Sequence, residues 1–194
     1  MKYLEVKTSN TTQIVSTADL KAHLRITFEE DDDYIIALEK AAVGMVEEYT
    51  NRFLLQTQLY QFGNKFADLE ILFKSPAMPN AVATPVALEY KSGGSWTSVS
   101  ASDYEYVNAI QPARLYGGEN WAAPTVDNIF QAWRLTYFVG YATAADIPQA
   151  LIQAIKITVA DMYENRQSVI VGKIVSEIPK TAQYLMNPYK IQTL

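Results

Sequence analysis

The chain has 194 residues, 49% of them hydrophobic and 19% charged, with a formal net charge of −5. A chain of this size and composition can bury a core without disulfides or metals. It has no cysteine and one histidine, which excludes disulfides, thiolate nucleophiles, cysteine zinc sites and two-histidine metal sites, and makes histidine-dependent triads hard to build. We therefore expect no cofactor, no metal and no enzymatic activity.

The opening segment MKYLEVKTSN lacks the apolar core of a signal peptide, and no stretch approaches the roughly 20 apolar residues that cross a bilayer. We expect an intracellular protein without membrane contact. With 21 acidic and 16 basic residues and no dense basic cluster, a surface that grips duplex DNA is not expected. A mildly acidic wall would suit a channel through which DNA slides, because like charges repel; the charge permits this interpretation without requiring it.

Two helices are predicted in the first fifty residues. Ser16 or Thr17 can cap a short helix that carries Leu20 and Leu24 on one face. A 3.6-residue period then predicts a longer helix from about Asp32 to Thr50. Its apolar stripe is formed by Ile35, Leu38, Ala42, Met45, Val46 and Tyr49.

The apolar stripe of the second helix is wider than one packing partner needs. Ile36 and Val43 extend it toward half the circumference. Either the β segment of the same chain or a neighbouring subunit should cover this extra edge. Glu39 falls within the widened face, so it should have a basic or hydrogen-bonding partner if it is buried.

An acidic run precedes this helix, from Glu29 to Asp33. Hard cations such as magnesium or calcium could use such oxygens, but the spacing matches no calcium loop. We predict instead that one aspartate caps the helix and that the others favour its positive end. His23, without a partner motif nearby, is predicted to be a partly exposed surface or packing residue.

The segment from Phe53 to Gly140 is predicted to be rich in strands and turns. The strand-like runs are FLLQTQLYQF, LEILF, VALEYK, SWTSV, DYEYV and FQAWRLTYFVGY. Ser92, Gly93 and Gly94 predict a hairpin turn between VALEYK and SWTSV. Gly140, which closes the last strand, should serve a backbone requirement rather than bind a ligand.

The last of these strands should be central in its sheet, because both of its faces carry apolar or aromatic groups. One face has Trp133, Leu135, Tyr137 and Val139, and the other has Ala132, Arg134, Thr136 and Phe138.

The stretch QPARLYGGENWAAPTVDN before that strand is predicted to be a mobile loop. Its glycines, like those of the GSW run, fit no phosphate-binding or dinucleotide motif. The aromatic residues of the segment pack in a core or hairpins, or form a surface for sugar or peptide; they are Trp96, Tyr104, Tyr106, Tyr116 and Trp121.

The third long helix is predicted to begin with Asp146 as an acidic N-cap, followed by Pro148 in the first turn. Ile157 lies off its apolar stripe in a second small patch. The following SVIVGKIVSEIP reads as a flexible or extended connection, and Lys180 to Met186 as a short helix. The apolar stripe of the long helix comprises Leu151, Ile152, Ile155, Val159, Met162 and Tyr163.

Together these elements predict an α+β fold. Residues 1–52 and 141–194 should form a helical bundle from both chain ends, with residues 53–140 as a β-rich insertion between the second and third helices.

The order of motifs from about Val15 to Ile191 resembles the phage head-tail connector (adaptor) family. The resemblance rests on VSTADLKAHLRIT, the acidic run, a helix that ends in EEYTNRFLLQTQ, and the strand and turn RLTYFVGYATAADIP. It continues with the helix QALIQAIKITVADMYENRQSV and a terminal P-x-x-x-x-x-L-x-x-P-Y that begins at Pro179. Each motif alone has a plain structural role, and only their ordered combination is specific. The large central segment is the least typical part.

Similarity to this family implies a subunit that assembles with itself into a ring of about twelve copies. Such a ring docks on the portal protein, extends the DNA channel and offers a platform to a stopper or tail-completion protein, with DNA passing only non-specifically through the lumen. The implied location is the virion neck, after assembly in the host cytoplasm. Alternatives are another neck or tail-completion protein, a β-module that binds carbohydrate or peptide, and a carboxylate-dependent metalloenzyme.

Candidate contacts with another subunit or with the portal come from both chain ends. Glu164 and Arg166 could lie at a subunit seam, where complementary charges fix rotational register, or could belong to a C-terminal capping arrangement of their helix. The full candidate set is Ile36, Glu39, Val43, Ile157, Glu164, Arg166, Tyr189 and Lys190.

Overall fold

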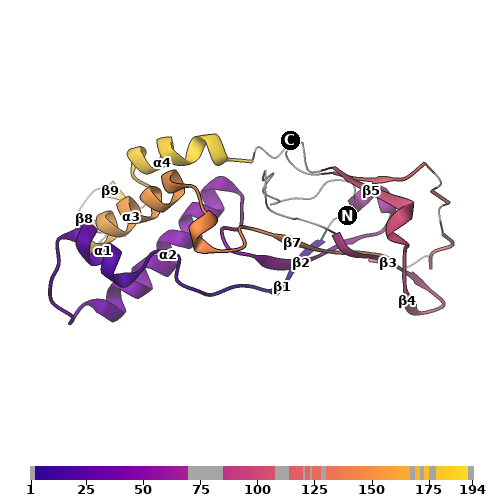
Figure 1. Ribbon diagram of the computed structural model, residues 1–194, viewed down its shortest axis with the longest axis horizontal. Coiled ribbons are helices and arrows are strands. Elements are labelled where there is room, and N and C mark those ends of the chain that lie inside the picture. The colour runs from indigo at the N-terminus through magenta and orange to yellow at the C-terminus, as the bar shows by residue number, and fades with distance from the viewer. Residues whose placement is uncertain are drawn as a thin grey trace. The chain divides into compact units, whose positions relative to one another are not determined.

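A computed structural model describes residues 3–69, 85–107, 114–119, 121–122, 124–127, 130–166, 169–170, 173–174 and 178–191. The chain divides into two compact units. The helical unit comprises Thr11–Leu54 and Thr143–Leu194, and the sheet unit comprises Met1–Asn10 and Leu55–Ala142. Four α-helices and a five-stranded sheet among the described residues make the fold α+β, as predicted (Figure 1).

The helical unit contains α1 (Thr17–Leu24), α2 (Asp32–Thr50), α3 (Gln149–Glu164) and α4 (Lys180–Met186). The predicted bounds of α2 and α4 are confirmed at both ends. Ser16 caps α1, because its hydroxyl oxygen accepts a hydrogen bond from the Asp19 amide at 3.1 Å. Helix α3 contacts each of the other three helices, and the shared core includes Leu20, Ile35, Ala42, Val46, Leu151, Ala154, Ile155, Val159, Ala182 and Met186.

The sheet unit is built on five strands in the spatial order β1-β2-β7-β3-β4, with every neighbouring pair antiparallel. The prediction of a central last strand is confirmed, because β7 lies in the middle of the sheet. Figure 1 shows β1, β2, β7 and β3 side by side. The strands are β1 (Tyr3–Thr8), β2 (Thr57–Gly63), β3 (Pro85–Ser92), β4 (Ser95–Ser98) and β7 (Trp133–Val139).

Strand β1 corrects the predicted domain division, which assigned the first residues to the helical part. Tyr3–Thr8 instead forms an edge strand that pairs with β2. The run YLEVKT alternates in side-chain direction but is exposed along most of its length, so it carries little of the apolar pattern that marks a strand. Pairing satisfies backbone groups of β2 that would otherwise lie at the sheet edge.

The two faces of the sheet differ. One face is buried and holds most of the apolar core of the unit: Leu59, Leu88, Trp133, Leu135, Tyr137 and Val139. Trp121 packs there, with its ring centroid 4.5 Å from that of Phe66 and 6.1 Å from that of Trp133. The opposite face is only partly covered and carries charged and aromatic side chains.

The hairpin predicted between β3 and β4 is confirmed. Gly93 and Gly94 have φ values of 59° and 81°, which glycine adopts at low cost. The carboxylate of Asp127 accepts hydrogen bonds from both glycine amides, at 3.0 and 2.9 Å. The turn is therefore fixed by a side chain that lies more than thirty residues farther along the chain.

Gly140 has the backbone role that we predicted. Its φ is 88°, and a Cβ placed on it would lie 2.2 Å from the carbonyl oxygen of Leu55. No other residue fits this close approach without movement of the backbone.

One prediction about a connection was wrong. The presumed loop before β7 contains β6 (Arg114–Gly117), which pairs with β5 (Tyr104–Val107). Strand β6 is short and relies on β5 for its hydrogen bonds, so local composition does not distinguish it from a loop. The connection after α3, which was predicted to be flexible or extended, contains an extended antiparallel pair, β8 (Val169–Ile170) and β9 (Lys173–Ile174). Most of the predicted strand LEILF lies outside the described residues.

Asp146 is not the N-cap of α3, so this prediction was also wrong. Pro148 occupies that position. The Asp146 carboxylate instead accepts hydrogen bonds from the amide and hydroxyl of Thr143, at 3.0 and 2.7 Å. It therefore stabilises the short 3-10 helix η3 (Ala144–Asp146) that leads into α3.

Candidate interaction surfaces

The described part of the chain offers surfaces rather than a metal centre. No three histidine, aspartate or glutamate side chains in it converge so that they could hold a metal ion. None of the helices seen in the described ranges has both the length and the apolar character to cross a bilayer. His23 is exposed on α1, as predicted. Polar chemistry is found in the contacts between helices and on one face of the sheet.

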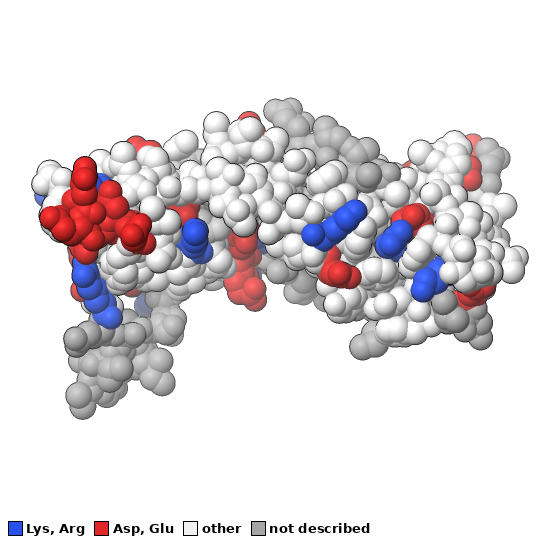
Figure 2. All heavy atoms as spheres, turned by 90° about the horizontal axis from the view of Figure 1, so that it is seen from below, with Lys and Arg blue, Asp and Glu red and all other residues white. Residues whose placement is uncertain are grey.

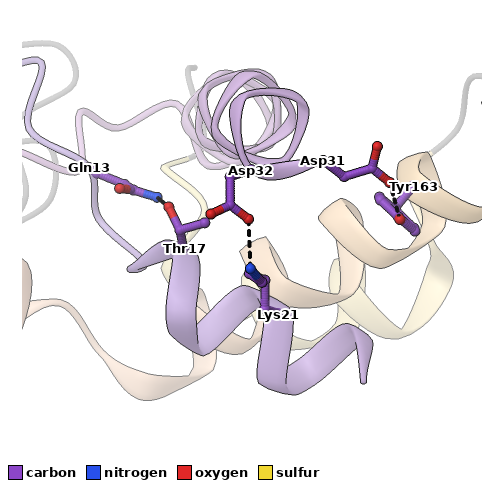
Figure 3. Close-up of polar contacts among 6 residues, drawn as sticks. All are labelled: Gln13, Thr17, Lys21, Asp31, Asp32 and Tyr163. Carbon is purple, nitrogen blue, oxygen red and sulfur yellow. Dashed lines mark hydrogen bonds and ion pairs between the residues drawn. The ribbon is translucent and has the colours of Figure 1, made fainter. Parts of the chain in front are cut away.

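The first contact joins the start of α2 to the end of α3. Asp31 is the N-cap residue of α2, but its side chain makes no capping hydrogen bond, so the predicted aspartate cap is wrong. Its carboxylate instead accepts hydrogen bonds from the Tyr163 hydroxyl, shown in Figure 3, and from the Arg166 guanidinium. Charge-assisted bonds of this kind are stronger than a neutral local bond, and here they connect two helices.

Aromatic rings hold Arg166 in this contact. Its guanidinium lies 4.8 Å from the ring centroid of Tyr34 and 4.6 Å from that of Tyr163. The Tyr163 hydroxyl, and secondly Arg166, lower the pKa of Asp31 below its usual value. The same carboxylate raises the pKa of Arg166. Arg166 is therefore bound within its own chain, whereas Glu164 is exposed at the helix end.

The acidic run is divided between bound and unbound carboxylates. Asp32 forms an ion pair with Lys21 at 2.8 Å (Figure 3), and Asp31 is bound as above. Glu29, Glu30 and Asp33 are exposed, and we call these three the acidic corner. Within the described ranges no lysine or arginine forms an ion pair with them. Figure 2 shows acidic side chains gathered at the end of the helical unit where α1 and α2 meet.

Glu39 lies inside the helical unit, with 2% of its surface exposed. It is therefore no surface contact, which corrects its place among the candidate interface residues. The expectation of a partner is confirmed: its carboxylate accepts hydrogen bonds from the amides of Ile14 and Val15, at 2.9 and 3.2 Å. Burial raises the pKa of Glu39, while the two backbone bonds act in the opposite direction.

The apolar candidates of the long helices are partly covered by their own unit. Ile36 and Val43 on α2 and Ile157 on α3 are each half-buried. Among the described residues of the helical unit, the exposed large hydrophobic side chains are Phe28 at 48% and Tyr184 at 74%. The widened apolar stripe is thus neither fully exposed nor fully buried within the chain.

The C-terminal candidates are tied to the end of α2. The carbonyl of Tyr189 accepts a hydrogen bond from Arg52, and the Ile191 amide donates to the Thr50 carbonyl at 2.9 Å. Lys190 is exposed, but its ammonium lies 4.6 Å from the ring centroid of Tyr49. These residues first serve to attach the C-terminal segment to the bundle.

The open face of the sheet carries alternating cations and aromatic rings. The Arg134 guanidinium lies 5.0 Å from the Tyr60 ring centroid and 4.4 Å from that of Trp96. The Lys7 ammonium lies 4.9 Å from Tyr60, and the Lys91 ammonium 5.0 Å from Trp96. We call Lys7, Tyr60, Arg134, Trp96 and Lys91 the cation–aromatic row. Such contacts fix the cations in place at modest gain in energy.

Sequence reasoning missed this row, although it placed Arg134 on the correct side of its strand. The row depends on the pairing of β1, β2, β7, β3 and β4, which no local pattern reveals. The five aromatic residues proposed as a possible sugar or peptide surface are not gathered. Trp96 belongs to the open face, Trp121 packs against Phe66, and Tyr116 is exposed on β6.

Comparison with known proteins gives matches to solved structures only. No family model matches the chain, and no curated protein is significantly similar to it.

Three similar chains come from structures of gene transfer agent (GTA) particles. One is from the neck of an empty particle computed with C6 symmetry, with a TM-score of 0.73 and 19% identity over 99% of this chain and 97% of that chain. Another is from the virion of a native particle, with a TM-score of 0.73 and 19% identity over 98% and 96%. A third is from the neck of a native particle computed with C12 symmetry, with a TM-score of 0.73 and 18% identity over 99% and 97%. At these identities the comparison shows a shared fold over nearly the whole of each chain.

Proposed function

We propose that the chain is a structural, non-enzymatic subunit of the neck of a phage-like particle. In its finer form the proposal is a head-tail connector (adaptor) that forms a ring of about twelve copies, docks on the portal and extends the DNA channel. The observation that carries it is the fold shared with chains of GTA necks over 99% of this chain and 97% of one such chain. A match of both units together is more specific than a match of one common domain would be.

The copy number has independent support in the symmetry of those structures. One neck was computed with C6 and one with C12 symmetry. A ring of twelve copies is compatible with both, because twelvefold rotation contains sixfold rotation. The net charge of −5 suits a lumen that DNA passes without adhering.

The helical unit supplies the proposed contacts with the portal and with neighbouring copies. Ile36, Val43 and Ile157 keep part of their surface exposed after the bundle has packed. A neighbouring subunit that buries the rest gains about 25 cal/mol for each Å² of apolar surface removed from water. The polar part of the proposed contact set is Glu164, Arg166, Tyr189 and Lys190.

A second candidate is another neck or tail-completion protein, such as a stopper, which the shared fold also accommodates. A sugar-binding β-module has less support, because the rings of Tyr60 and Trp96 on the open face already have cations against them. Those ring faces are therefore not free to stack on a sugar.

The test is addition of the purified chain to particles that carry the portal but lack this chain, taken from a lysate in which its gene is disrupted. The proposal predicts that the chain co-sediments with these particles in about twelve copies each, counted by quantitative mass spectrometry. Particles without portal serve as the control and should bind none. Binding only after another neck protein has been added would favour a stopper or tail-completion role. Absence of binding under every condition would contradict a place in the neck.

A further inference from the structure

Two surfaces of the chain carry opposite charges that the protomer itself leaves unneutralised. The first is the cation–aromatic row on the sheet. Arg134 in its centre forms an ion pair with Glu89 at 2.8 Å. Lys7 and Lys91 at its two ends contact rings, but no carboxylate in the described part of the chain pairs with their ammonium groups.

The aromatic rings make this row suitable for binding. A free lysine loses considerable side-chain entropy when it binds a partner. Lys7 and Lys91 are already restrained against Tyr60 and Trp96, so less of that entropy remains to be lost. The row therefore presents two ammonium groups in fixed places around the Arg134–Glu89 pair, with the exposed carboxylate of Glu5 on the same face, opposite Tyr60. In Figure 2 the basic side chains over the sheet unit are separate groups with acidic side chains near them.

The second surface is the acidic corner. Like the row, it has charged groups without an ion-pair partner around others that are paired within the same chain. Its inner members are bound within the protomer, Asp31 to Arg166 and Asp32 to Lys21. These bonds fix the backbone between α1 and α2. The outer members, Glu29, Glu30 and Asp33, remain exposed and without an ion-pair partner among the described residues.

We propose that the cation–aromatic row of one copy binds the acidic corner of a second copy. Each copy has a net charge of −5, so copies repel one another on average. A contact between copies is favoured where a surface with excess positive charge meets one with excess negative charge. The row, with three cations against Glu5 and Glu89, and the acidic corner provide such a pair. The contact joins different patches, which is the head-to-tail geometry that generates rings. The inference rests on the proposed function, because it names one contact between neighbouring copies of the proposed ring.

Nucleic acid is a less suitable occupant of the row. The rings of Tyr60 and Trp96 are occupied by cations, so bases have little free ring surface on which to stack. The charge test below includes DNA as a separate readout.

Charge reversal tests the contact directly. The row variant is K7E/K91E, and the corner variant is E29K/E30K/D33K. Each alone should weaken self-association about tenfold, because two or three exposed ion pairs become repulsive. An equimolar mixture of the two variants should restore assembly, since each reversed surface then meets a reversed partner and each unchanged surface an unchanged one. The readouts are sedimentation velocity at low and high salt and the number of copies bound to portal-bearing particles.

Matched controls carry the same change in charge elsewhere. K40E/K65E matches the row variant, and E48K/E105K/E119K matches the corner variant; all five side chains are exposed. Both controls should assemble like the unmodified chain. If the two patch variants also assemble normally, the inference is wrong while the proposed function stands. If they fail and the mixture fails too, the patches bind something other than each other, and the inference is again wrong.

Two further outcomes separate the remaining cases. The unmodified chain could bind a short DNA duplex that K7E/K91E fails to bind, while K7E/K91E still self-associates. This result would assign the row to nucleic acid and overturn the inference. An unmodified chain that neither self-associates nor joins portal-bearing particles would contradict the proposed function and the inference together.

Zero-length carbodiimide cross-linking gives a second test on the unmodified chain. A mixture of isotopically light and heavy copies is assembled on portal-bearing particles and then cross-linked. The inference predicts cross-links from Lys7 or Lys91 to Glu29, Glu30 or Asp33 that join a light peptide to a heavy one. Cross-links of these residues only within copies of one label, or only to the portal, would overturn it.

Discussion

The helical unit and the sheet unit connect distant parts of the chain by different chemistry. In the helical unit polar side chains bridge the segments: Glu39 binds the Ile14 and Val15 amides, and Asp31 binds Tyr163. In the sheet unit the backbone hydrogen bonds between β2 and β7 join distant segments, and one face of the paired strands is buried and apolar. Changes in charge and pH should therefore act mainly on the helical unit, and loss of apolar volume mainly on the sheet unit.

The largest effect is expected for Leu135→Ala on the buried face of β7. Leu135 has 0% of its surface exposed, and truncation of such a residue costs about 2–5 kcal/mol through lost burial and the cavity left behind. Phe62→Ala on the half-exposed face should cost about 1 kcal/mol. Urea unfolding measures both. Equal losses would show that the two faces do not differ as described.

Glu39→Leu should destabilise the helical unit by about 1–3 kcal/mol, because the amides of Ile14 and Val15 lose their acceptor in a buried place. Glu39→Gln keeps an acceptor oxygen and is the matched control, with a smaller loss. Chemical unfolding followed by helical circular dichroism reports the difference. If the glutamine variant were less stable than the leucine variant, the hydrogen bonds to the backbone would not explain how Glu39 stabilises the helical unit.

The pKa values of Asp31 and Glu39 should be shifted in opposite directions. That of Asp31 should lie below its usual value of 3.8, and that of Glu39 above its usual value of 4.5. The pKa of Asp31 is lowered by Tyr163 and Arg166, so its stabilising contribution is present above pH 3.8 and lost as the pH falls through the lowered pKa. Burial raises the pKa of Glu39, so the folded state loses stability as the pH rises from 4.5 through the raised pKa. Asp31 therefore favours folding at higher pH, and Glu39 favours folding at lower pH.

Titration of the side-chain carboxyl carbons by NMR measures both midpoints. Asp31→Asn should remove the lower transition, and Glu39→Gln the upper one. A midpoint of Asp31 above 3.8 would contradict the contact with Tyr163 and Arg166.

The smallest effect is expected for Lys91→Met on the open face. The change keeps the aliphatic stem and removes the cation over Trp96, so it should cost about 0.5–1 kcal/mol. Lys65→Met is the control, since Lys65 is exposed and no ring contact involves it among the described residues. A loss for Lys91→Met as large as that for Leu135→Ala would make the open face part of the core.

Helices with their own periodicity could be predicted from the sequence. Helix α2 begins and ends at the predicted residues, Asp32 and Thr50, and α4 does so at Lys180 and Met186. In both helices the apolar repeat lies within the element itself. The β3–β4 turn was predictable for the same reason, because Gly93 and Gly94 mark it locally.

Elements that depend on a distant partner could not be predicted in this way. Strand β1 is exposed and gains its hydrogen bonds from β2, more than fifty residues farther along the chain. Asp31 occupies the N-cap position but binds Tyr163 and Arg166 instead, more than 130 residues away. The cation–aromatic row needs the order of five strands. In each case the sequence indicates what kind of contact the residue can make, but it does not indicate which distant residue is the partner.

The most direct test of a place in the neck is imaging of portal-bearing particles, deficient in this chain, after the purified chain has been added back. Averaged images should show a new ring with twelvefold symmetry below the portal at a single vertex, and a tag on the chain should mark that ring. Added chain that is found elsewhere on the particle, or that leaves the portal vertex unchanged, would contradict the account.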